Sequence, residues 1–217
     1  MKKTSLRTPF DVFMDAFIVR NIVLVQAIGL CPVIMAGTHL KQAVVLTVCT
    51  AIILVPSSLI MSLFGEKIPA WLLPPIYTIF AAALLTASGF AIERYVSPEL
   101  YAALDIFIPL LAVNTLLTFR AGGFALRNRP AVAVADSIAS TFGFGLVICV
   151  VSVLREIASF GTVWDIKVTT PRLLPEAALP YAAFILLGFM AAFIQWIKSG
   201  IAAVLRKRQE SVAEGIN

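Results

Sequence analysis

The sequence predicts an all-α integral membrane protein with six transmembrane helices, arranged as two inverted three-helix repeats whose first and fourth helices are broken. The composition is the first indication, because 60% of the 217 residues are hydrophobic and only 13% are charged. Soluble domains are about 45–50% apolar and about 25% charged. The second indication is a series of apolar runs, each near the roughly 20 residues that cross a bilayer. The third is that two of these runs contain helix-breaking residues.

Six apolar runs have the required length, and we expect them to form one integral membrane domain covering residues 1–217. The connections between them are short, except for a polar segment at 155–176. The net charge of +5 does not indicate nucleic-acid binding, because basic residues in membrane proteins serve topology and contact lipid headgroups. The predicted spans are approximately 18–38, 42–64, 70–92, 100–119, 131–154 and 177–197.

The first and fourth runs contain the breaks. Gly29, Cys31 and Pro32 lie together inside the first run, and Pro109 precedes Asn114 in the fourth. Proline lacks an amide hydrogen and clashes with the preceding turn of a helix. Interrupted backbone at membrane depth is tolerated only where it is buried in protein or lines a cavity. We therefore expect functional sites at these two breaks.

The two halves of the chain share an order: a broken run followed by two longer runs. Three spans in each half is an odd number, so the second half is inverted relative to the first. Inverted repeats with discontinuous helices that meet near the midplane are a known arrangement in transporters. The alternative is six unrelated spans with incidental prolines.

Basic residues predict the orientation. With both termini in the cytoplasm, 12 of the 17 lysines and arginines lie on the inner side and 5 on the outer side. The positive-inside rule favours this arrangement over its reverse. We therefore predict a multi-pass protein of the bacterial inner (cytoplasmic) membrane, embedded in lipid, with both termini cytoplasmic.

Two segments carry a resemblance to a known family. Gly29-Leu30-Cys31-Pro32 and Ile106-Phe107-Ile108-Pro109-Leu110 with Asn114 resemble the small membrane subunits of the Rnf and Nqr respiratory complexes, most closely the RnfE/NqrD branch. The resemblance covers about residues 20–200. Further matching positions are Asn21, Val25-Gln26, Arg120-Ala121, Asp136, Leu154-Arg155-Glu156-Ile157, Gly161-Thr162 and Asp165.

The resemblance implies a subunit of a redox-driven, ion-translocating NADH or ferredoxin oxidoreductase complex, rather than an enzyme by itself. Two homologous six-span subunits of opposite topology would pair and share an intramembrane [2Fe–2S] cluster. The cluster would relay electrons across the membrane between flavin-bearing and iron–sulfur subunits. The implied cofactor-binding residues are Gly29, Leu30, Cys31, Asn114 and Thr115, with Cys31 as the metal ligand.

Thr115 departs from the family pattern, in which a cysteine follows the asparagine. Thiolates normally hold iron–sulfur clusters, and a neutral hydroxyl is a poor ligand. Three explanations remain open: a cluster with a substitute ligand, a homologue that has lost the cluster, or a relocated cysteine at Cys49 or Cys149. Free cysteines commonly pack as small hydrophobic residues, which is the ordinary interpretation of these two. Asp105 and Gly122 also differ from the family pattern.

Asp105 and Asp136 are the acidic residues nearest the apolar runs, which makes them candidates for an ion pathway. Asp136 has an ordinary alternative, capping or pairing with Arg127 or Arg129 at the membrane surface. For Asp105 the alternative is a favourable interaction with a helix dipole. For Arg155-Glu156 we weigh a surface pair against a docking contact for an outer subunit.

A second function from another class stays open. A diverged, cluster-free homologue would act as a transporter or a membrane scaffold, with the helix breaks forming a site for a small molecule or an ion.

Overall fold

The computed structural model describes residues 29–64, 68–69, 71–95, 98–164, 166–167 and 174–214. Nearly all of this is helical, and five helical stretches are long and apolar enough to cross a membrane. Each overlaps one of the predicted spans. Residues 18–28 of the predicted first span, 18–38, lie outside the described residues. The five stretches are α3 (Leu40–Phe64), α4 (Leu73–Tyr95), Phe107–Ala125, α8 (Pro130–Phe160) and Pro180–Ile197 at the start of α9.

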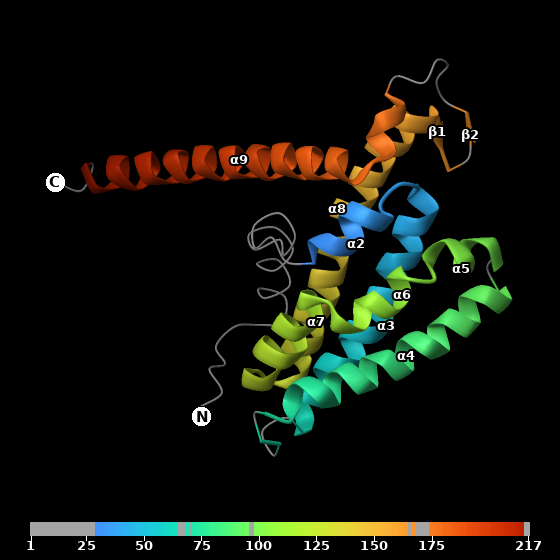
Figure 1. The fold of residues 1–217 in the computed structure, drawn as a ribbon. Helices are drawn as coiled ribbons and strands as arrows, with labels where there is room; N and C mark the ends of the chain where they lie inside the picture. Colours follow the sequence, from blue (N-terminus) through green and yellow to red (C-terminus); the bar gives the residue numbers. More distant parts are fainter. Residues whose placement is uncertain are drawn as a thin grey trace.

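The core lies between α3 and α8, the two helices that share most contacts (Figure 1). Leu46, Ile53, Phe144 and Val147 are among their fully or almost fully buried side chains. Gly145 permits the close approach, because a Cβ atom there would collide with the side chain of Thr47 on α3. α4 also packs against α3.

The fourth predicted span begins later than expected. Instead of one run at 100–119, α5 (Pro98–Leu104) ends at a turn, and the apolar stretch follows at Phe107–Ala125. That stretch consists of α6 (Phe107–Leu110), a 3₁₀ turn (Leu111–Val113), α7 (Thr115–Phe119) and a π-helical turn (Arg120–Ala125). Asn114 separates α7 from the preceding turn, with extended backbone at φ −66° and ψ 135°.

Prolines stand at the starts of short helices. Pro32 is the third residue of α2 (Leu30–Ala36), and Pro109 is the third residue of α6. The first residues of a helix have no intrahelical acceptor for their amide hydrogens, so a proline there removes no hydrogen bond. In contrast, Pro56 lies inside α3, which remains helical through it.

The expected connection at 155–176 is wrong at its beginning. α8 continues through Arg155 and Glu156 to Phe160 and ends at Gly161, whose left-handed backbone (φ 67°) closes the helix. A two-stranded antiparallel hairpin follows, formed by β1 (Thr162–Val163) and β2 (Ile166–Lys167). A 3₁₀ turn (Pro175–Ala178) then leads to α9 (Pro180–Glu214).

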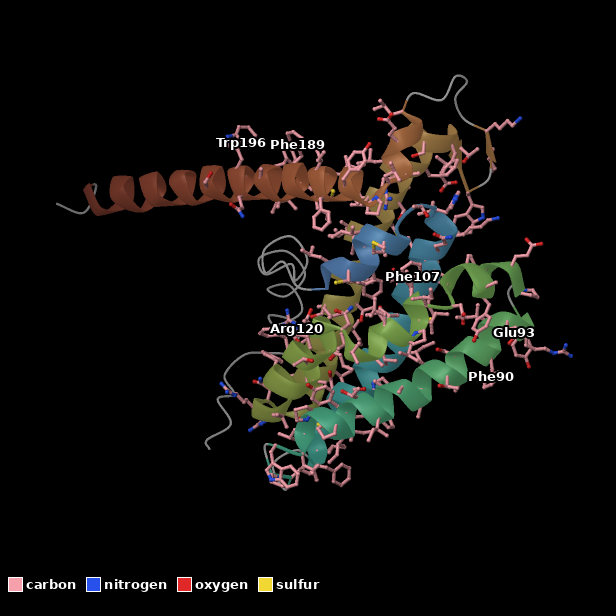
Figure 2. The ribbon with its side chains drawn as sticks, viewed as in Figure 1. Phe90, Glu93, Phe107, Arg120, Phe189 and Trp196 are labelled. Carbon is pink, nitrogen blue, oxygen red and sulfur yellow. The ribbon has the colours of Figure 1, made fainter. Side chains whose placement is uncertain are left out.

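α9 extends away from the other helices (Figure 1). Its first turns pack against α2 and α8, where Ala183 and Leu187 are buried. Further along, Phe189 and Trp196 project from the side facing away from α2 (Figure 2), and each is 72% exposed. The exposed apolar side chains of this helix are suited to contact with lipid or with another membrane subunit.

Candidate functional site

The candidate site is formed where the start of α2 meets the start of α7. Gly29 precedes α2 with left-handed backbone (φ 75°, ψ 28°), a conformation that glycine adopts without steric cost. Its amide donates a hydrogen bond of 3.2 Å to Oγ1 of Thr115, 86 residues further along the chain. The structure therefore brings together the two segments that the sequence marked as breaks.

Asn114 shapes the second of these segments. Its side-chain Oδ1 accepts a hydrogen bond from the Leu116 amide at 3.2 Å, which makes Asn114 the N-cap of α7. The Thr115 hydroxyl lies 3.4 Å from the same Oδ1. A Cβ atom at position 29 would also lie 3.4 Å from it, so Gly29 fits closely against the Asn114 side chain.

Cys31 is in the first turn of α2 and its side chain is exposed. Thr115 is exposed as well, but its oxygen already accepts from Gly29. Cys49 is buried on α3, and Cys149 is partly buried on α8. In the described ranges, no three His, Cys, Asp or Glu side chains form a metal-binding group.

Cys31 and Thr115 can be compared with the requirements of a [2Fe–2S] cluster, which takes four ligands, ordinarily thiolates. The exposed Cys31 thiol fits one ligand position. Thr115 does not fit a second, because it is a neutral hydroxyl engaged with backbone. The described residues at this contact therefore fit a single ligand position and not the pair expected from the family pattern.

Two buried side chains fix the other end of α2. Arg155 is 1% exposed, and its Nη1 donates to the carbonyl oxygens of Ile34 at 2.9 Å and Gly37 at 3.0 Å. The last carbonyls of a helix have no intrahelical donor, so this guanidinium caps α2. The same group donates to carbonyl oxygens before α9, those of Ala177 at 3.0 Å and Ala178 at 2.6 Å.

Glu156 completes this arrangement at the start of α3. It is also 1% exposed, and its Oε2 accepts from the Leu40 amide at 2.8 Å. Its Oε1 accepts from the Thr162 hydroxyl at 3.3 Å and lies 3.9 Å from Nδ1 of His39. The expectation of a surface pair at Arg155-Glu156 is therefore wrong, since both side chains bind backbone at helix ends.

Asp136 forms a buried ion pair with Arg120. Nη1 of Arg120 donates to both carboxylate oxygens, at 2.7 and 3.0 Å. The alternative pairing with Arg127 or Arg129 is wrong, because the π-helical turn begins at Arg120 and places this residue against α8 (Figure 2). Nε and Nη2 of Arg120 have no hydrogen-bond partner among the described residues.

Asp105 lies elsewhere, at the turn between α5 and α6. It lines a cavity against α4 to which Asp136 does not contribute. The two acidic residues proposed for an ion pathway are therefore not brought into one site. Sequence reasoning missed the capping role of Arg155, because its acceptors are backbone carbonyls that no sequence motif marks.

Comparisons with known proteins identify the family. A model described as the Rnf-Nqr subunit, membrane protein, matches residues 9–191. An ion-translocating oxidoreductase complex subunit of Shewanella sp. strain ANA-3 is 35% identical over 207 residues, covering 88% of this chain and 86% of the relative. The subunits of the same name from Shewanella sp. strain MR-4 and Shewanella oneidensis are 34% and 33% identical with the same coverage. The chain belongs to the Rnf-Nqr family of membrane-protein subunits.

Proposed function

We propose that this chain is a membrane subunit of an ion-translocating Rnf/Nqr-type oxidoreductase complex, in which it relays electrons across the inner membrane together with a homologous partner subunit. The family match and the names of the relatives support membership of such a complex. The observation that carries the relay is the contact of Gly29 with Thr115 beside the exposed Cys31. A thiol at the surface of the subunit is available to a partner.

The proposed architecture is two inverted three-helix repeats, with broken helices at 18–38 and 100–119 and both termini in the cytoplasm. The start of α2 after Gly29 and the start of α7 after Asn114 support it, because the two segments meet as equivalent breaks would. The homologous subunit would place its own breaks against these. Flavin-bearing and iron–sulfur subunits would complete the complex on either side.

Within this arrangement, Cys31 is the one residue of the described chain at the break contact that suits iron. A shared [2Fe–2S] cluster would supply a one-electron carrier, with its remaining ligands from outside this chain. The chain's own residues hold Cys31 in place: Thr115 binds the backbone before α2, and Arg155 binds the carbonyls at its end. Leu30 and Asn114 would line the same site.

A cluster-free homologue that acts as a transporter or scaffold is the second candidate. The observation that favours it is the engagement of Thr115, which leaves this chain with one thiolate at the contact. In that case, the helix breaks would form a site for an ion or small molecule. Cys31 would then be dispensable.

The test is to purify the tagged complex and compare wild type, C31S and the matched control C149S. Under the electron relay, C31S lowers the iron content, removes one low-temperature EPR signal and abolishes electron transfer, whereas C149S retains all three. Iron content, spectra and electron transfer in the C31S complex that match those of wild type would rule out the relay through Cys31 and favour the second candidate. A chain that copurifies with no flavin-bearing or iron–sulfur subunit would contradict membership of the complex.

A further inference from the structure

The β1–β2 hairpin lies beside the last turn of α8 and does not extend beyond the end of that helix. Gly161 ends α8 with left-handed backbone, and the hydroxyl of the next residue, Thr162, donates to Oε1 of Glu156 at 3.3 Å. Glu156 lies about one helical turn before Phe160, the last residue of α8. The chain therefore reverses direction at Gly161, and β1 packs against α8 (Figure 1).

The length of α3 gives the depth of this hairpin in a bilayer. α3 has 25 residues and is about 37 Å long at 1.5 Å per residue. This length exceeds the hydrocarbon core of about 30 Å but not the roughly 40–45 Å that include the headgroups. Leu40, the first residue of α3, therefore lies near a headgroup layer. Its amide donates to Oε2 of Glu156 at 2.8 Å, and Glu156 also binds Thr162, so the hairpin begins at the same depth.

The exposed side of α8 reaches this depth as well. Residues four positions apart lie on the same face of a helix. On α8, such a series of exposed apolar side chains consists of Ile138, Phe142, Leu146, Val150 and Leu154. We call this series the lipid-facing side of α8, because exposed apolar side chains at membrane depth suit acyl chains. It ends two residues before Glu156, where the hairpin begins.

Trp164 occupies a backbone position that is unusual for a tryptophan. Val163 pairs with Ile166, so Trp164 begins the tight turn between the two strands. Its φ of 58° is in the left-handed region, which bulky residues rarely adopt and which Gly, Asn or Asp ordinarily occupy in such turns. The ring is 46% exposed, and the neighbouring Ile166 is 68% exposed. The turn itself favours a smaller residue, so a contact of the exposed ring accounts better for the tryptophan.

We propose that this hairpin anchors the chain in the headgroup layer of the bilayer, with the Trp164 ring in contact with lipid. Tryptophan combines a large apolar ring with one N–H donor, and it is enriched at membrane–water interfaces for that reason. Ile166 adds apolar surface, and the exposed Lys167 supplies a positive charge for lipid phosphates. The hairpin does not include the Cys31 contact, so the proposal does not rest on the electron relay.

Depth-dependent fluorescence quenching of the full chain in phosphatidylcholine vesicles tests this anchor. The chain has three tryptophans, so W71F/W196F leaves Trp164 as the single reporter. Trp71 and Trp196 are both exposed, and replacing them removes no core packing. The vesicles carry a nitroxide on the headgroup, near the start of the acyl chain or near its end. We expect the first two nitroxides to remove the largest fraction of the Trp164 emission and the third to remove the smallest.

A deeper reporter calibrates the measurement. L146W, in the same variant with W164F added, places a tryptophan midway along the lipid-facing side of α8, where the nitroxide near the chain end should quench most. Quenching of Trp164 by aqueous iodide but by no lipid nitroxide would overturn the proposal, as would an order of quenching equal to that of L146W.

Photocrosslinking in native membranes separates lipid from a protein that covers the hairpin. Benzoylphenylalanine in place of Ile166 puts a photoreactive group on the exposed strand. Contact with lipid predicts no specific protein adduct after irradiation, whereas the same group in place of a residue at a subunit contact would form one. A specific adduct between position 166 and another subunit would overturn the proposal.

Discussion

Replacing Arg155 with methionine tests whether this side chain holds the two ends of the break region together. Methionine fills similar space but offers no donor. Four carbonyl oxygens, those of Ile34, Gly37, Ala177 and Ala178, accept from the guanidinium at 2.6 to 3.0 Å. In R155M, all four would lose this donor, those of Ile34 and Gly37 in a buried environment and those of Ala177 and Ala178 in a partly buried one.

The magnitude follows from these carbonyls. A buried polar group left without a partner costs about 1–3 kcal/mol, and hydrogen bonds to charged groups are the stronger kind. Removing a buried charge also recovers part of its desolvation cost, so the four contributions do not simply add. We expect R155M to lower the free energy of unfolding by about 3–5 kcal/mol, or the unfolding temperature by roughly 10 °C.

The assay is thermal or SDS-induced unfolding of the detergent-purified chain, followed by tryptophan fluorescence. R94M is the matched control, because Arg94 is exposed in the last turn of α4 and its replacement is expected to change stability by about 0.5 kcal/mol or less. R155K keeps the positive charge but not the planar guanidinium group, so its stability should lie between those of R155M and R94M. If R155M were as stable as R94M, the capping role assigned to Arg155 would be wrong.

Three further changes test other parts of the structure. D136N leaves the Arg120 charge buried without its carboxylate, so the free energy of unfolding should fall by about 3–5 kcal/mol. The fall should be smaller when Arg120 is also replaced by methionine, because no unpaired charge then remains buried. G145V introduces a side chain into the contact between α3 and α8 and should cost about 1–3 kcal/mol in the same assay, whereas an unchanged stability would contradict that packing. In the folded, detergent-solubilised chain, a maleimide should label Cys31 much faster than Cys49, with the difference lost in SDS; equal rates before unfolding would contradict the exposure of Cys31.

The spans were predictable because length and apolarity decide whether a helix crosses a membrane. Their boundaries were not, because packing sets where a helix continues. α8 runs to Phe160 since Arg155 and Glu156 find buried partners, although both residues look like the start of a polar loop. The fourth span shifted to Phe107–Ala125 because the chain turns after Leu104, before the proline that the sequence offered as the break.

The sequence singled out Gly29 and Asn114 from their residue types, and the structure places these two residues in contact. The pairing of two broken transmembrane helices stays a prediction. The sequence did not show that the Thr115 hydroxyl accepts a hydrogen bond from the Gly29 amide. A threonine at a position where the family has cysteine indicates only that a thiolate is missing. The Arg120–Asp136 pair was likewise missed, since the π-helical turn alters the phase that regular spacing assumes.

These contacts explain how a helix as short as α2 can position Cys31. Seven residues are too few to form a stable helix alone, because nucleation is costly and only a few hydrogen bonds repay it. Side chains from elsewhere therefore supply the partners: Thr115 at the first end, and Arg155 with Glu156 at the junction with α3. A positive charge at the end of α2 and a negative charge at the start of α3 also match the two helix dipoles. Thr115 consequently has a role that needs no metal, so its presence is compatible with either candidate function, and the thiol of Cys31 is the group that separates them.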